Sequence, residues 1–345
     1  MKKRILSLIL LITFTVSSLS ACSQSTKQTA ERFDCFDTYS ALTIYCTNKE
    51  FEIYKAEFDA MTEKYHKLFD IYNLYDGTVN LKTLNDRAAL SPVTVSDELF
   101  DALVLAKELY NITYGKCNVA IGSVTSIWHD ARTLSIKSPN KAYIPSQEEI
   151  NEALLHTDIN NLILDEETKS VLYSDPKLLL DFGAIAKGYV ASLLYKRLIA
   201  IDCKNFLINL GGNVVSYGMK MQNEPWLVKI ENPFDNKNSG YNEAIELNDS
   251  TLVTSGSYQR YYTYNEKKYS HIIDSVNGYP ADLFTSVSIQ APADSSALAD
   301  ALSTALFCMS YEDGFSLVDK LENVEALWIF NDGSIKSTSN FGGGK

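Results

Sequence analysis

Two periods of apolar side chains alternate along the chain and predict a mixture of helices and strands. Apolar residues recur at helical spacing over about 50–70 and again over 96–110, so both segments are expected to be amphipathic helices. Ser96 can cap the second helix, and Ser146 with Glu149 forms the capping box of a shorter one. Residues beyond about 295 are expected to form two more helices, the first rich in small side chains.

Short runs of β-branched and aromatic residues predict strands, mostly in the second half of the chain. Turn formers such as Asn277-Gly278 and Asn331-Asp332-Gly333 separate neighbouring runs, as in antiparallel hairpins. No internal repeat or interior linker is found, so the sequence predicts one α+β domain with antiparallel-rich sheets flanked by helices. The expected strands lie at 36–46, 162–164, 171–173, 206–210, 214–217, 226–230, 244–247, 251–255, 261–264, 269–273 and 284–290.

The first 32 residues differ from the rest. Residues 1–21 combine three basic side chains with an apolar stretch too short for a good membrane span, as in an export signal. The stretch ends in Leu19-Ser20-Ala21-Cys22, which resembles a bacterial lipobox and predicts cleavage before Cys22 and lipid on its sulfur. The alternative is an ordinary signal peptide with an accidental cysteine. Residues 22–32 are polar and predict a tether, so we expect a lipid-anchored protein on the extracytoplasmic side of the cell membrane.

Charge and cysteine content narrow the possible partners. The formal net charge of the 345 residues is −12, and removal of residues 1–21, which hold three basic and no acidic residues, makes it −15. An acidic chain argues against nucleic acid as a partner, and an anionic ligand would need local cations or a metal. Besides Cys22 there are five cysteines, an odd number with no Cys-x-x-Cys, so no metal–thiolate site is expected.

Residues 177–190 combine an apolar run, a tight passage of small residues and a helical pattern. They predict a buried strand at Leu178–Leu180, a carboxylate at its end in Asp181, and a helix that begins near Ala184. A helix start presents unpaired N–H groups and favours a phosphate, and Lys187 would add a full positive charge. The alternative is an ordinary strand–helix junction with a solvated lysine.

Two more stretches hold candidate chemistry. On a helix, Asp300 and Thr304 lie on one face with Ser303 beside it, and a carboxylate with hydroxyls suits Mg²⁺. A solvated aspartate and a back-bonded threonine are the alternative. His271, on an expected strand that ends at Asp274, is the candidate for acid–base work, or else a structural histidine bonded to a turn carbonyl.

These stretches, in their order and spacing, resemble the ApbE family of FAD:protein FMN transferases. The resemblance covers about residues 33–341 and implies a T-fold-like single domain. The upstream Phe36-Asp37-Thr38, Leu84-Asn85 and Trp128 fit the N-terminal half of the family. The motifs that carry it are Asp181-Phe-Gly-Ala-Ile-Ala-Lys-Gly-Tyr, Asn209-Leu-Gly-Gly-Asn, Thr254-Ser-Gly-Ser-Tyr, His271-Ile-Ile-Asp-(x)₃-Gly-Tyr-Pro and Ala299-Asp-Ala-Leu-Ser-Thr-Ala.

The resemblance implies transfer of FMN from FAD to a threonine hydroxyl of a partner flavoprotein, with release of AMP. It also implies Mg²⁺ held by the Ala184 carbonyl, Asp300 and Thr304, with Ser303 where relatives carry another carboxylate. His271 is expected to accept the threonine proton, with Asp274 as the alternative base, and Lys187 to take up phosphate charge. The implied FAD contacts are Phe36, Tyr72, Lys116, Cys117, Asn118, Asp181, Lys187, His271 and Ile273.

The chain departs from the family pattern at two places in the expected flavin pocket. Many relatives have Met-Gly-Thr at Phe36-Asp37-Thr38 and Ala-Phe-Asp at Lys116-Cys117-Asn118. Two other functions stay open on the same residues. One is an Mg²⁺-dependent FAD pyrophosphatase that gives FMN and AMP, and the other is a lipid-anchored flavin-binding protein without turnover.

Overall fold

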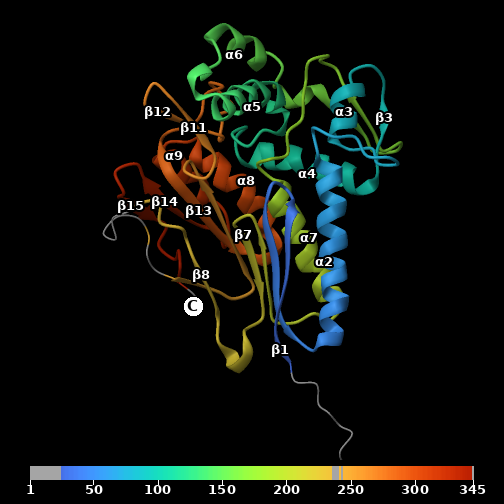
Figure 1. Cartoon of the computed structure of the whole chain (residues 1–345), viewed down its shortest axis with the longest axis vertical. Coiled ribbons are helices and arrows are strands. Elements are labelled where there is room, and N and C mark those ends of the chain that lie inside the picture. The colour runs from blue at the N-terminus through green and yellow to red at the C-terminus, as the bar shows by residue number, and fades with distance from the viewer. Residues whose placement is uncertain (1–24, 235–240, 242–243, 344–345) are drawn as a thin grey trace, which may run out of the picture.

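The computed structural model describes residues 25–234, 241 and 244–343, so the predicted signal peptide and Cys22 lie outside the described residues. Its main element is an eight-stranded sheet in the order β1-β2-β6-β7-β10-β13-β14-β15, with every neighbouring pair antiparallel (Figure 1). The predicted antiparallel architecture is confirmed. The strands are β1 (Thr26–Cys35), β2 (Thr38–Cys46), β6 (Phe206–Leu210), β7 (Asn213–Tyr217), β10 (Ser250–Gly256), β13 (Phe284–Pro292), β14 (Glu325–Phe330) and β15 (Ile335–Ser337).

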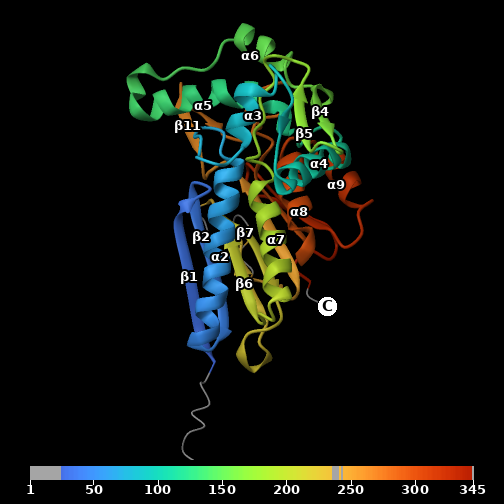
Figure 2. The same ribbon diagram turned by 90° about the vertical axis from the view of Figure 1, so that its right-hand side faces the viewer.

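Three helices cover one face of this sheet. They are α2 (Asn48–Phe69), α7 (Ala186–Ala200) and α8 (Ser296–Phe307), which pack on one another and on the strands (Figure 2). The layer arises because each helix buries an apolar face against the sheet. The buried face of α2 includes Tyr54, Phe58, Tyr65 and Leu68. A further helix, α9 (Tyr311–Val318), packs on β14.

Most of the remaining elements form a lobe at one end of the sheet, at the top of Figure 1. Trp128 lies at its centre, donates its indole N–H to the Gly278 carbonyl at 2.7 Å and stacks on Tyr269. The capping residues predicted from sequence, Ser96, Ser146 and Glu149, occupy their expected positions. The elements of the lobe are α3 (Leu81–Arg87), α4 (Asp97–Ile112), α5 (Gly122–Lys137), α6 (Gln147–Leu154), the β3 (Val93–Thr94), β5 (Ser170–Tyr173), β4 (Leu162–Asp165) sheet and the β11 (Tyr261–Tyr264), β12 (Lys267–Ser270) hairpin.

The described chain also contains a separate two-stranded sheet. Strands β8 (Trp226–Lys229) and β9 (Ala244–Leu247) pair beside the large sheet. All five described cysteines are free and buried. No helix among the described residues is long and apolar enough to span a membrane.

The structure corrects several predictions from sequence. The tether predicted over 22–32 is wrong from Thr26 onward, since these residues form β1 and pair with β2. The strand predicted at Leu178–Leu180 does not form. The segment is tied instead to Asn85, whose side-chain oxygen accepts the Leu180 N–H at 2.8 Å and whose amide donates to the Leu180 carbonyl at 2.9 Å.

Two more corrections concern the residues around the candidate site. His271 does not lie on a strand that ends at Asp274, because β12 ends at Ser270. The helix of the 177–190 segment begins at Ala186, so Lys187 is its second residue rather than one turn inside. Helices α3 and α5 were not expected from the sequence.

Candidate active site

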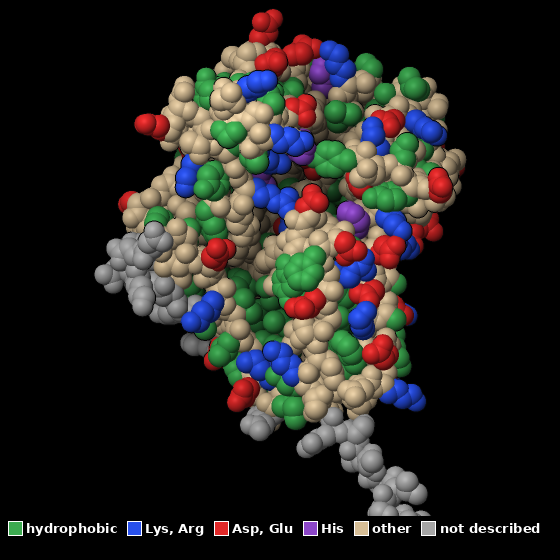
Figure 3. Space-filling view, in the orientation of Figure 1, with side chains coloured by type: hydrophobic (Ala, Val, Ile, Leu, Met, Phe, Trp, Pro, Cys, Tyr) green, Lys and Arg blue, Asp and Glu red, His purple; other side chains and the backbone are tan. Residues whose placement is uncertain are grey.

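A cavity of about 680 Å³ lies between the lobe and the large sheet. Its wall combines the turn between β1 and β2, the loop after α2, one face of α5, the start of α7 and the segment after β12. Figure 3 shows the hollow near the middle of one face, with basic side chains beside it. Most of the predicted site residues meet here: Phe36, Tyr72, Lys116, Asn118, Asp181, Ala184, Lys187, His271, Ile273, Asp300 and Thr304.

Asp300 is the most buried acid of the cavity, with 3% of its surface exposed. Its Oδ2 accepts the Gly188 N–H at 2.8 Å and lies 3.9 Å from the Lys187 Nζ. Burial raises the pKa of this carboxyl, while Lys187 and the Gly188 N–H act in the opposite direction. A β-carbon on Gly188 would lie 2.3 Å from the Ser296 carbonyl oxygen, so only glycine lets α7 approach α8 this closely.

The donors around Asp300 fit a hard cation. Gly188 is the third residue of α7, so its N–H has no partner within the helix, and Asp300 accepts it instead. No backbone hydrogen bond to the Ala184 carbonyl is found among the described residues. Thr304 lines the same cavity one turn after Asp300. A free carbonyl, a carboxylate and a hydroxyl are the oxygen ligands that suit Mg²⁺, so the residues fit this ion.

Three predicted site residues do not line the cavity. Ser303 is buried and bonds the Ser255 hydroxyl at 2.7 Å and the carbonyl of Asp300 at 2.9 Å. Cys117 is also buried in the core, and burial raises the pKa of its thiol to about 12. Asp274 pairs with Lys116 at 2.9 Å and accepts the Val276 N–H, so its carboxylate holds a turn.

Asp181 and Lys187 lie at the start of α7. The Asp181 carboxylate accepts the Thr125 hydroxyl from α5 and the Gly183 N–H, each at 2.8 Å. These bonds fix the passage into the helix. The Lys187 ammonium lies 3.3 Å from the Gly183 carbonyl, on the cavity side of the helix start. A cation and the exposed N–H groups of a helix start together favour an anionic group.

His271 has a defined tautomer. Its Nδ1 lies 3.2 Å from the Arg260 carbonyl, which can only accept, so the Nδ1–H donates and Nε2 holds the free lone pair. Burial of the ring lowers the His271 pKa to about 4, and the nearby cations Arg260, Arg132 and Lys187 act in the same direction. The imidazole is therefore neutral at neutral pH and can accept a proton at Nε2.

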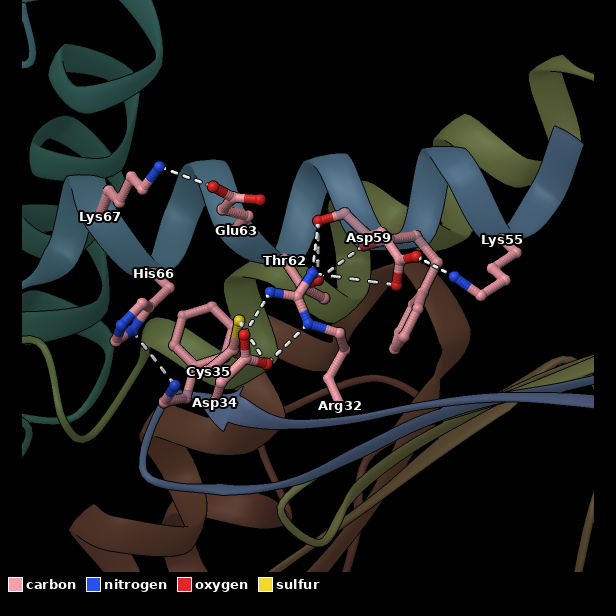
Figure 4. Close-up of polar contacts among 11 residues, drawn as sticks. Arg32, Asp34, Cys35, Lys55, Asp59, Thr62, Glu63, His66 and Lys67 are labelled. Atoms are coloured by element: carbon pink, nitrogen blue, oxygen red, sulfur yellow. Dashed lines mark hydrogen bonds and ion pairs between the residues drawn. The ribbon is translucent and has the colours of Figure 1, made fainter. Parts of the chain in front are cut away.

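The turn that presents Phe36 has unusual backbone geometry. Phe36 and Asp37 both adopt positive φ, 57° and 51°, where glycine or asparagine is usual. The Phe36 N–H donates to His66 Nδ1 at 3.2 Å. Figure 4 shows how the preceding strand end is tied to α2, because Arg32 pairs with Asp34 at 2.7 Å and donates to the Asp59 carbonyl at 3.2 Å.

Some residues of the cavity were not found from the sequence. Arg132 on α5 and Arg260 before β11 both line it, and so do His129 and Thr125. The sequence gives little indication of these residues, because α5 was not predicted and neither arginine belongs to a recognisable motif. Only the fold brings them near His271.

Comparisons with known proteins agree on one family. The ApbE family model matches residues 36–328. The "FAD:protein FMN transferase" of Treponema pallidum is 31% identical over 275 residues, which cover 75% of this chain and 73% of that protein. The protein of the same name from Klebsiella pneumoniae is 30% identical over 270 residues, or 76% of this chain and 81% of its own.

A solved structure supports the same assignment. The crystal structure of the ApbE protein from Thermotoga maritima aligns with a TM-score of 0.79 and 25% identity, over 92% of this chain and 98% of that one. The family-model match, the named relatives and the shared fold agree, and the chain belongs to the ApbE family.

Proposed function

We propose that this protein is an Mg²⁺-dependent FAD:protein FMN transferase that joins FMN to a threonine hydroxyl of a partner flavoprotein and releases AMP. One observation carries the proposal. A single cavity combines oxygen donors for a hard cation, a lysine at a helix start and a neutral histidine with a free Nε2. The relatives that share most of the chain are named for this activity.

The metal site would be formed by the Ala184 carbonyl, Asp300 and Thr304. When bound there, Mg²⁺ would neutralise charge on the phosphate oxygens of FAD. The chain's own contribution is to hold the donors: the Gly188 N–H fixes one carboxylate oxygen of Asp300, and the α7–α8 contact sets the separation of Asp300 from Ala184.

Lys187 and His271 would act on the reacting phosphate. The threonine oxygen forms a bond to the phosphorus of the FMN half, and the bond from this phosphorus to the bridging oxygen breaks. The bonding electron pair leaves on the phosphate of AMP, and the hydroxyl proton passes to Nε2 of His271. Lys187, beside Asp300 and at the helix start, would stabilise charge on the transferred phosphate.

We also propose that the mature protein begins at a lipid-modified Cys22 and is held outside the cytoplasmic membrane. The basic residues at positions 2–4, the short apolar stretch and the lipobox-like Leu19-Ser20-Ala21-Cys22 support this anchor. The first described strand, β1, begins at Thr26, so little chain would separate the anchor from the folded domain.

One experiment tests the function against its alternatives. The protein is incubated with FAD and Mg²⁺, with and without a threonine-bearing acceptor, and the products are separated by chromatography. We expect flavin-labelled acceptor and AMP. Free FMN with AMP and unlabelled acceptor would identify a pyrophosphatase, and unchanged FAD would identify a binding protein without turnover. Either of these results contradicts the proposal.

A further inference from the structure

Two arginines of the cavity lack the carboxylate partners that Arg32 and Arg197 have. Arg32 and Arg197 each pair with a carboxylate, Asp34 and Glu57, through two nitrogens. Among the described residues, Arg132 and Arg260 form no ion pair. Arg132 Nη2 lies 3.3 Å from His129 Nδ1, and Arg260 Nη2 donates to the Asp37 carbonyl at 2.5 Å.

These two guanidinium groups also lie near one another. Burial lowers the pKa of Arg132, and repulsion by Arg260 lowers it further, although Tyr72 and Asp181 act in the opposite direction. Arg132 is partly buried and Arg260 is exposed, and among the described residues no carboxylate pairs with either guanidinium group, so both are available to an anion. Guanidinium forks match the geometry of phosphate oxygens especially well.

The arginines mark the junction of the cavity with a second groove. This groove has a volume of about 400 Å³ and shares four residues with the main cavity, Arg132 and Arg260 among them. Ile136 and Tyr261 add apolar surface that could pack on a nucleoside. Asp37 lines it as well, but Arg260 contacts the backbone carbonyl of Asp37 and not its carboxylate. The full lining is Asp37, Arg132, Ile136, Gln259, Arg260 and Tyr261.

The positive charges that act on His271 come from two parts of the cavity. Lys187 lies 3.9 Å from Asp300, on the side of the proposed metal site. Arg260 and Arg132 line the second groove as well as the cavity, whereas Lys187 lines the cavity alone, and all three cations lower the His271 pKa. A diphosphate with its reacting phosphorus near Nε2 would therefore place one phosphate at Lys187 and the other at the arginines.

We propose that Arg132 and Arg260 bind the phosphate that leaves with the nucleoside, and that the second groove receives the nucleoside. This assignment rests on the proposed function and refines it. When the bond to the bridging oxygen breaks, the electron pair adds negative charge to the departing phosphate. Two fixed guanidinium groups at this position stabilise that charge without reorganisation.

The test measures binding of AMP and of FMN, separately, to the mature full-length protein in detergent with Mg²⁺ by titration calorimetry. Arg132→Gln and Arg260→Gln should each weaken AMP binding by about 10- to 100-fold, as expected for loss of charge-assisted hydrogen bonds. FMN affinity should change by less than about 3-fold, since its phosphate lies at Lys187. Arg132→Lys keeps the charge but loses the fork, and should fall between Arg132→Gln and the unchanged protein.

Arg197→Gln, an exposed arginine on α7, is the matched control and should leave both affinities unchanged. Thermal melting establishes that each variant is folded. If Arg132→Gln does not fold, AMP binding by Arg132→Lys is measured in its place. Unchanged AMP affinity in both Gln variants overturns the proposal. So does a loss of FMN affinity equal to the loss of AMP affinity.

Failure of the proposed function would look different. A protein that binds AMP through the arginines but labels no acceptor would keep the phosphate assignment and contradict the transfer reaction. A protein that labels its acceptor, but whose AMP affinity does not depend on either arginine, would support the transfer reaction and contradict the phosphate assignment.

Discussion

The contact between α7 and α8 at Gly188 gives the most demanding test of the structure. In Gly188→Ala the new β-carbon would lie 2.3 Å from the Ser296 carbonyl oxygen and 2.5 Å from the β-carbon of Asp300. Both neighbours are on or next to the backbone of a packed helix, so they cannot rotate away. The helices must separate, and the Gly188 N–H then moves away from Asp300 Oδ2.

The size of the effect follows from three contributions. Overpacking typically destabilises by about 1–3 kcal/mol. Loss of a hydrogen bond to a charged group adds about 1.5–3 kcal/mol. Alanine in place of glycine within a helix stabilises the folded state by about 1 kcal/mol. The free energy of unfolding should therefore fall by about 1.5–5 kcal/mol, the sum of these contributions.

Urea unfolding measures this change, and a titration of FAD cleavage with Mg²⁺ measures the effect on the site. We expect the half-saturating Mg²⁺ concentration to rise because Asp300 loses the donor that orients it. Gly314→Ala in α9 is the matched control, since its added β-carbon would meet only side chains, at 3.3 Å and beyond. If Gly188→Ala is as stable as Gly314→Ala and needs no more Mg²⁺, the close helix contact and its role are wrong.

Three further predictions concern the base, the strained turn and the anchor. His271→Ala should slow FMN transfer by about 10²–10⁴-fold. Single-turnover reactions with saturating FAD measure this rate. A variant that binds FAD more weakly but transfers FMN at an unchanged rate would show that His271 binds FAD and is not the base. Because the folded pKa of His271, about 4, lies below its ordinary value of 6.5, the neutral base persists on acidification. The transfer rate should stay level from neutral pH to about 5 and fall below that, so a rate that halves near pH 6.5 would contradict it. Asp37→Gly should raise the free energy of unfolding by about 0.5–1 kcal/mol, since φ at this position is 51°; an unchanged urea midpoint would count against strain there. Cys22→Ser should release the protein from membranes or stop its processing in cell fractionation, and normal retention of a processed form would exclude the lipid anchor.

The sequence identified those parts of the fold in which local pattern and burial agree. Helices α2 and α4 have continuous apolar faces and side-chain caps, and both form as predicted. Strand β1 was not predicted, because only two of its ten residues, Ala30 and Cys35, are buried. A segment with so few apolar side chains has the same polar pattern as a tether. At Leu178–Leu180 the apolar run is buried as expected, but Asn85 satisfies its backbone and no strand partner is needed.

In the candidate site, too, the sequence predicted only the residues that a local pattern relates to one another. Asp300 and Thr304 could be placed together because one helix face fixes their relation, and Ala184 joins them only through the motif match. Ser303 is adjacent to that face in sequence, yet it points to Ser255, since a helix rotates each residue by about 100° from the last. Arg132 and Arg260 meet through tertiary structure alone, with no local pattern that could have linked them.

The central claim is that FMN moves from FAD to a threonine of another protein at the Asp300 site, and the mass of the acceptor tests it most directly. The mature protein, Asp300→Ala and the control Asp101→Ala, an exposed aspartate on α4, are each incubated with FAD, Mg²⁺ and a threonine-bearing acceptor. Intact mass spectrometry measures the acceptor, and chromatography measures AMP. We predict an acceptor heavier by one FMN less one water, one AMP for each label, and loss of both products in Asp300→Ala only. AMP without a labelled acceptor, or full labelling by Asp300→Ala, would contradict the account.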